Sequence, residues 1–68
     1  MTTVDARGLS CPEPVLMTKK AAEAHKGEQI RVLVSEPHSC HNVEKFARSM
    51  KLKVEVREMD EDFELILQ

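Results

Sequence analysis

The sequence predicts an α/β domain whose strands and helices follow the order βαβαββ. Three segments alternate apolar and polar residues at the two-residue period of a half-buried strand. Two other segments carry the start signals and the apolar spacing of helices. With 68 residues the chain has room for one core, so we expect a single domain over residues 1–68.

The N-terminal part is expected to form a strand, a turn and the start of a helix. Residues 2–5 favour β-structure and form the strand. The turn follows at residues 7–9, where Gly8 can adopt a backbone conformation that other residues resist. The first helix is then expected to begin between Ser10 and Pro12, since proline is tolerated in a first turn.

The start of this helix has two interpretations. Ser10, followed three residues later by Glu13, fits a capping box and makes Cys11 the first helical residue. If Pro12 is the first helical residue, Cys11 is the N-cap. In both cases the sulfur of Cys11 lies in the first turn, and the helix runs to about Lys26.

The middle of the chain predicts a second strand and a second helix. Residues 29–35 alternate cleanly and are expected to be a strand. Residues 36–39 are expected to be a loop, because Pro37 interrupts a helix, and the second helix should start near Ser39 or Cys40. Its buried stripe follows helical spacing and consists of Val43, Phe46, Ala47 and Met50.

The C-terminal part predicts a hairpin. Two alternating segments, residues 52–57 and 63–67, flank an acidic turn at residues 60–61. A strand–helix–strand crossover normally joins parallel strands, with the helix antiparallel to both. Both helices should therefore begin at the same edge of the sheet, which would place Cys11 and Cys40 at one end of the molecule.

Cys11 is the candidate catalytic residue. A helix start presents unpaired N–H groups and the positive end of the macrodipole, and both favour a thiolate by lowering the thiol pKa. Pro12 and Pro14 stiffen the turn, Arg7 adds positive charge, and Glu13 opposes it. The alternative interpretation of these residues alone is a small, buried and unreactive cysteine.

Residues 5–15 resemble the opening of the TusA/SirA/YedF family of small sulfur-carrier proteins. The family pattern is an aspartate, then a glycine three residues later, then Cys-Pro-x-Pro at the start of the first helix. Here the pattern is met by Asp5, by Gly8 and by Cys11-Pro12-Glu13-Pro14. Chain length, element order and the loop-then-helix segment at residues 36–47 also match. The resemblance implies a two-layer sandwich, with a mixed four-stranded sheet and two helices on one face.

The same resemblance implies a sulfurtransferase-like carrier rather than a stand-alone enzyme. Cys11 would accept sulfane sulfur as a persulfide from a cysteine desulfurase or another donor. It would then relay the sulfur to a downstream acceptor protein, for example in tRNA thiolation or sulfur metabolism; selenium handling would need the same site. No cofactor is implied, and a monomer is expected. Asp5 is expected to support the site by bonding the turn at Gly8 or by capping the loop.

A regulatory module is the alternative class, in which Cys11 and Cys40 sense redox state or dock a partner. Cys40 is a candidate second thiol that could attack a neighbouring persulfide or form a disulfide. Its simpler interpretation is a helix-capping or partly buried cysteine. His38 and His41 flank it, but their spacing matches no standard zinc signature, so no metal site is expected.

Composition argues against two further classes of function. The net charge is −2 with no basic stripe, and the chain has two Phe and no Tyr or Trp, so direct nucleic-acid binding is not expected. No apolar run approaches the roughly 18 residues that span a bilayer, and the N-terminus lacks the features of a signal peptide. We therefore expect a cytoplasmic protein without membrane contact.

Overall fold

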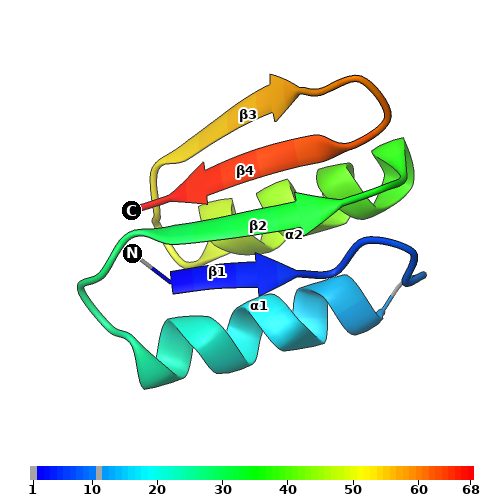
Figure 1. Ribbon diagram of the computed structural model, residues 1–68. Coiled ribbons are helices and arrows are strands. Elements are labelled where there is room, and N and C mark those ends of the chain that lie inside the picture. The colour runs from blue at the N-terminus through cyan, green and yellow to red at the C-terminus, as the bar shows by residue number, and fades with distance from the viewer. Residues whose placement is uncertain (1, 11) are drawn as a thin grey trace.

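The computed structural model describes residues 2–10 and 12–68 of the chain. Within this part the elements follow the predicted order βαβαββ (Figure 1). The strands are β1 (Thr2–Asp5), β2 (Ile30–Val34), β3 (Val54–Glu58) and β4 (Phe63–Leu67). The helices are α1 (Glu13–Ala24) and α2 (Pro37–Ser49).

The strands form one mixed sheet in the order β1-β2-β4-β3. β1 and β2 are parallel, whereas β4 pairs antiparallel with both β2 and β3. The helices pack on one face of this sheet and leave the other face open (Figure 1). The predicted two-layer arrangement is confirmed.

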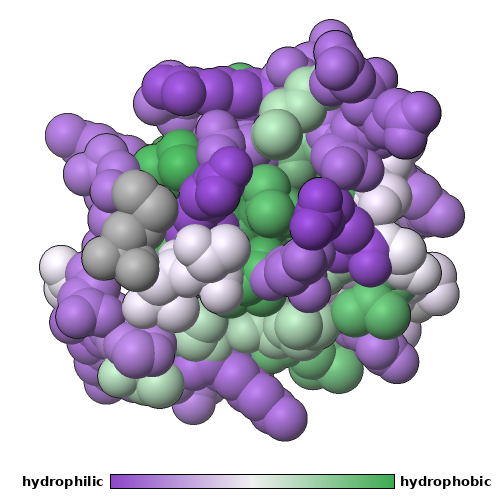
Figure 2. Space-filling model, in the orientation of Figure 1, coloured by the Kyte–Doolittle hydropathy of each residue, from purple (hydrophilic) through white to green (hydrophobic). Residues whose placement is uncertain are grey.

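The alternation of the strands determines which side chains enter the core. Val4, Val32 and Leu65 lie in register across three strands, and two of them are fully buried against the helices. Residues of the opposite parity face outward, where Arg31 forms an ion pair with Glu64. In Figure 2 polar side chains surround a small apolar area on this face, and the outward-facing Leu33 and Glu64 are only 7% and 9% exposed.

The first helix begins later and ends earlier than the sequence predicts. Pro12 is the N-cap, and no side chain caps the helix. Both predicted starts, the capping box at Ser10 and Pro12 as the first helical residue, are therefore wrong. Ser10 instead accepts the Glu13 N–H through its backbone carbonyl at 3.0 Å. The helix ends at Ala24 rather than Lys26, because the chain turns toward Gly27, whose φ is +82°.

The second helix begins at Pro37, two residues before its earliest predicted start at Ser39. Proline fits this first helical position, where its missing N–H would have no partner within the helix. Most of the predicted stripe is inside, with Val43 and Ala47 fully buried and Phe46 half-buried. Met50 is 51% exposed, because it follows the end of the helix as the C-cap, and its placement in the core was wrong. The stripe continues toward the N-terminus instead, through the buried Ser39 and Cys40.

Both helices begin at the same edge of the sheet, as predicted. β3 runs parallel to β2 because both pair antiparallel with β4, so β1, β2 and β3 all run in the same direction. Each helix therefore begins at the edge where the preceding strand ends and leads back to the opposite edge, where the next parallel strand starts. Cys40 lies in the first turn of α2 at this edge. Cys11 lies outside the described residues, and its proximity to Cys40 stays a prediction.

Candidate functional site

The described residues around Cys11 define the site, because Cys11 itself lies outside the described part of the chain. Residues 6–12 connect β1 to α1, and of these the structure describes 6–10 and 12. Ser10, Pro12 and Glu13, which flank the cysteine in sequence, are all exposed. A partner protein can therefore reach the chain at the point where α1 begins.

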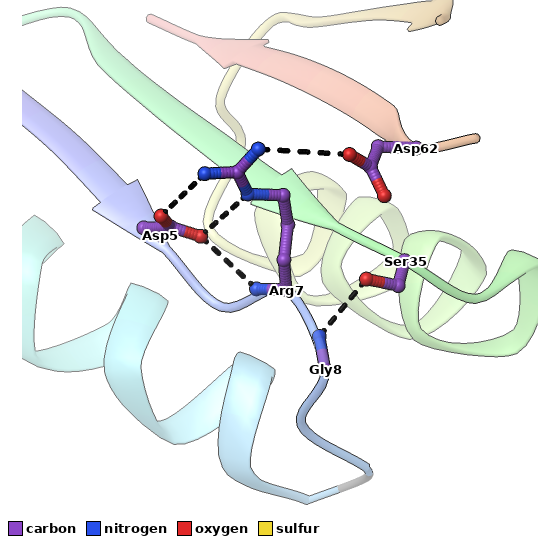
Figure 3. A network of polar contacts seen from close by, with 5 residues as sticks. All are labelled: Asp5, Arg7, Gly8, Ser35 and Asp62. Atoms are coloured by element: carbon purple, nitrogen blue, oxygen red, sulfur yellow. Dashed lines mark hydrogen bonds and ion pairs between the residues drawn. The ribbon is translucent and has the colours of Figure 1, made fainter. Parts of the chain in front are cut away.

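Asp5 and Arg7 form a local clamp at the end of β1 (Figure 3). The Asp5 carboxylate accepts the Arg7 Nε–H at 2.9 Å, the Nη2–H at 2.8 Å and the Arg7 backbone N–H at 3.2 Å. These bonds lower the pKa of Asp5 to about 2, since the charged form is their acceptor. The predicted hydrogen bond to the turn therefore exists, but it goes to Arg7 and not to Gly8.

The Arg7 guanidinium also faces the β3–β4 turn. Its Nη1 lies 3.7 Å from Oδ2 of Asp62 (Figure 3). The pKa of Arg7 is raised further above its ordinary value, first by the hydrogen bonds to Asp5 and then by the negative charges around it. The positive charge that was expected to favour a thiolate at Cys11 is thus shared between two carboxylates.

Gly8 is held by Ser35, the residue that directly follows β2. Its backbone N–H donates to Oγ of Ser35 at 2.9 Å, across 27 positions of sequence (Figure 3). Gly8 has a φ of +79°, a conformation that side chains disfavour, so glycine suits this turn. Ser35 and Asp62 were missed by sequence reasoning, since only the pairing of β1 with β2, and of β2 with β4, brings them to the loop.

The first turn of α1 has one inward and two outward residues. Pro14 is fully buried, while Pro12 and Glu13 are exposed. The Pro14 carbonyl accepts the hydroxyl of the buried Thr18 at 2.8 Å, which ties the first turn to the second. Pro14 therefore anchors the helix start in the core, and the exposed side remains open to a partner. Leu16, on the next turn, is 50% exposed.

The first turn of α2 carries two buried groups. Cys40 is 7% exposed, and burial, with the negative charges of Glu44 and Glu58, raises the pKa of its thiol. Ser39 is 1% exposed, and its hydroxyl has no hydrogen-bond partner among the described residues. Cys40 does not cap α2, whose N-cap is Glu36, and it is more fully buried than the partly buried cysteine that the sequence suggested.

The histidines flanking Cys40 lie on the surface. His38 and His41 are both exposed. Within residues 2–10 and 12–68, no group of three or more His, Cys, Asp or Glu side chains is arranged to hold a metal ion. In the same residues, neither helix has the length and apolar character needed to cross a bilayer.

Two surface hollows lie on α1. One, of about 240 Å³, is lined by Glu13, Leu16, Met17 and Lys20, next to the helix start. The other, of about 210 Å³ and mostly apolar, lies at the opposite edge between the ends of both helices. The edge of the sheet at which α1 begins thus presents an exposed helix start with an open hollow beside it.

These features define a small α/β protein that presents a helix start, preceded by a cysteine, at one edge of an open-faced sheet. The family model "Sulfurtransferase TusA" matches residues 2–68, and the chain belongs to this family. The chain is also similar to the crystal structure of a SirA-like protein from Desulfitobacterium hafniense, with 34% sequence identity and a TM-score of 0.93. That match covers 98% of this chain and 95% of the other. The resemblance predicted from residues 5–15 is confirmed, and the family is one of sulfurtransferases.

Proposed function

We propose that this protein is a sulfur carrier that holds sulfane sulfur as a persulfide on Cys11 and relays it to an acceptor protein. One observation carries the proposal. The sequence Cys11-Pro12-Glu13-Pro14 stands where α1 begins, in a chain of the sulfurtransferase TusA family. The start of a helix favours a thiolate, which is the reactive form in sulfur exchange.

The transfer is a displacement at sulfur. The Cys11 thiolate attacks the terminal sulfur of a donor cysteine persulfide, and a new S–S bond forms as the donor S–S bond breaks. The electron pair of the broken bond leaves on the donor cysteine as a thiolate, and the terminal sulfur keeps its proton. An acceptor thiolate then attacks the Cys11 persulfide in the same way. No net oxidant or reductant is consumed in either step.

The exposed helix start supports a carrier that works by docking. Ser10, Pro12 and Glu13 are accessible, and Pro14 fixes the turn in the core. The donor would be a cysteine desulfurase or another persulfide protein, and the product thiolated tRNA or another sulfur compound. The net charge of −2 favours meeting RNA through an acceptor protein rather than directly. We place the protein in the cytoplasm, acting as a monomer.

The alternative, a redox sensor using a Cys11–Cys40 disulfide, is less well supported. A disulfide requires attack by a thiolate, and the buried Cys40 has a raised pKa. Burial also restricts the access of an oxidant to this sulfur. The carrier function needs only Cys11.

Intact-mass measurement tests the proposal. Wild type, Cys11→Ser and Cys40→Ala are each incubated with a cysteine desulfurase and free cysteine. We expect wild type and Cys40→Ala to gain the mass of one sulfur atom and Cys11→Ser to gain none. If wild type gains no sulfur from a desulfurase or from glutathione persulfide, the carrier function is wrong.

A further inference from the structure

The loop that leads to Cys11 is tied to the sheet at two backbone positions. The Ala6 N–H donates to the Leu33 carbonyl at 2.8 Å and extends the pairing of β1 with β2. Two residues later, the Gly8 N–H donates to Ser35 Oγ at 2.9 Å. The second tie depends on a side chain, so a single substitution can remove it without touching the loop.

Ser35 offers this acceptor from a fixed position. It directly follows Val34, which is fully buried and pairs with Phe63 of β4. Ser35 itself is half-buried, and its hydroxyl is directed toward Gly8 in Figure 3. The sheet thus holds the backbone next to Ser35 in place. The hydrogen bond from Gly8 to the Ser35 hydroxyl therefore fixes the loop relative to the sheet.

The other polar contacts of the loop are local or longer. Asp5 and Arg7 are two residues apart, so their clamp shapes the loop without attaching it to a distant element. The contact from Arg7 to Asp62 measures 3.7 Å, beyond the distance of a direct hydrogen bond. Among the described contacts, the bond from Gly8 to Ser35 is therefore the closest side-chain tie between loop and scaffold.

We propose that Ser35 is a positioning residue for sulfur transfer, which acts through Gly8 to orient the segment that carries Cys11. The inference rests on the proposed carrier function. Displacement at sulfur needs the attacking sulfur in line with the S–S bond that breaks, and small errors of placement lower the rate strongly. Gly8 lies three residues before Cys11. Loss of the bond to Gly8 should therefore make the segment that leads to the start of α1 more mobile.

The test compares Ser35→Ala, which removes the acceptor, with Ser35→Thr, which keeps a hydroxyl. Ser49→Ala is the matched control, because the Ser49 hydroxyl bonds the Phe46 carbonyl on the surface at the far end of α2. For each variant, the rate of sulfur transfer from a cysteine desulfurase is measured beside the rate of Cys11 alkylation by iodoacetamide. Melting temperature and exchange of the Gly8 amide hydrogen are measured on the same samples.

We expect Ser35→Ala to slow sulfur transfer by about five- to ten-fold. Alkylation by the small reagent should change by less than about two-fold, because it approaches from many directions. Gly8 amide exchange should be faster in Ser35→Ala alone. Ser35→Thr and Ser49→Ala should transfer sulfur at close to the wild-type rate.

Three results overturn the inference while leaving the carrier function intact. Ser35→Ala transfers sulfur as fast as wild type, or Ser35→Thr is as slow as Ser35→Ala, or alkylation and transfer slow by the same factor. In each case the wild-type protein still gains sulfur. If wild type gains none, the carrier function fails first, and the role of Ser35 fails with it.

Discussion

One aspartate and one arginine shape the turn that precedes the candidate cysteine. Asp5 accepts three hydrogen bonds from Arg7, two from the guanidinium and one from the backbone. Both side chains are about half exposed, so solvent screens the pair and its contribution to stability is small. Its effect is mainly to define the local shape of the loop.

The Asp5–Arg7 clamp predicts a pH-dependent difference in stability for Asp5→Asn. The folded pKa of Asp5 is about 2, below its ordinary value of 3.8, so the carboxylate stabilises the fold above the unfolded pKa. This contribution is lost as pH falls through the folded value. Melting temperatures should therefore be lower for Asp5→Asn than for wild type near neutral pH, and the two should converge toward about pH 2. A difference that stays constant over this range contradicts the assignment.

The buried Cys40 predicts slow alkylation in the Cys11→Ser variant. Burial, aided by Glu44 and Glu58, raises the thiol pKa, so little thiolate is present near neutral pH. Iodoacetamide should label Cys40 at least about ten-fold more slowly than free cysteine until denaturant is added. Labelling at the rate of free cysteine in the native protein would show that this thiol is accessible.

The unpartnered hydroxyl of Ser39 predicts a stabilising substitution. Ser39 is 1% exposed, and its Oγ has no hydrogen-bond partner within residues 2–10 and 12–68. A buried hydroxyl without a partner is costly, so Ser39→Ala should raise the free energy of unfolding by about 1 kcal/mol. Denaturant unfolding measures the change, with Ser49→Ala as a surface control. A loss of stability of similar size would mean that the hydroxyl has a partner.

At the level of elements, periodicity predicted the strands and the order, because alternation directly reflects which face is buried. Residues 63–67 were expected as a strand, and β4 covers the same residues. The starts of the helices were harder to predict from the sequence, since they depend on competing local signals. Pro37 was read as an interruption, although proline also suits the first helical position. The Ser10 capping box failed because the helix begins only at Glu13.

The two ends of the α2 stripe predict different costs of truncation. Val43 is fully buried, so Val43→Ala removes methyl groups from the core and should lower the free energy of unfolding by about 2 kcal/mol. Met50 is half exposed at the C-cap, so Met50→Ala should cost less than about 1 kcal/mol. Denaturant unfolding of both variants tests the contrast. Equal losses would place Met50 in the core after all.

At the scale of the whole molecule, the fold brings the site together from segments that no local pattern connects. The motif around Cys11 was visible in the sequence, but Ser35 and Asp62 were not. Ser35 reaches the loop because β1 pairs with β2, and Asp62 because β4 begins beside the end of β2. Predicting these contacts needs the strand order and register, which the alternation of single strands does not supply.

The two edges of the sheet, at the opposite ends of the strands, carry different features. Both helices start at the edge that holds residues 6–10, whereas β1 begins and β4 ends at the opposite edge (Figure 1). The apolar hollow lies at that opposite edge, between the ends of the helices. The edge that holds residues 6–10 therefore presents the exposed start of α1. This arrangement fits a site that acts on a docked partner.

The central claim is that the sulfur resides on Cys11. Wild-type protein is loaded with sulfur by a cysteine desulfurase, its persulfides are trapped with an alkylating reagent, and its peptides are sequenced by tandem mass spectrometry. The account predicts the additional sulfur on the peptide that contains Cys11 and none on the peptide that contains Cys40. Sulfur found on Cys40, or on neither peptide, would contradict it.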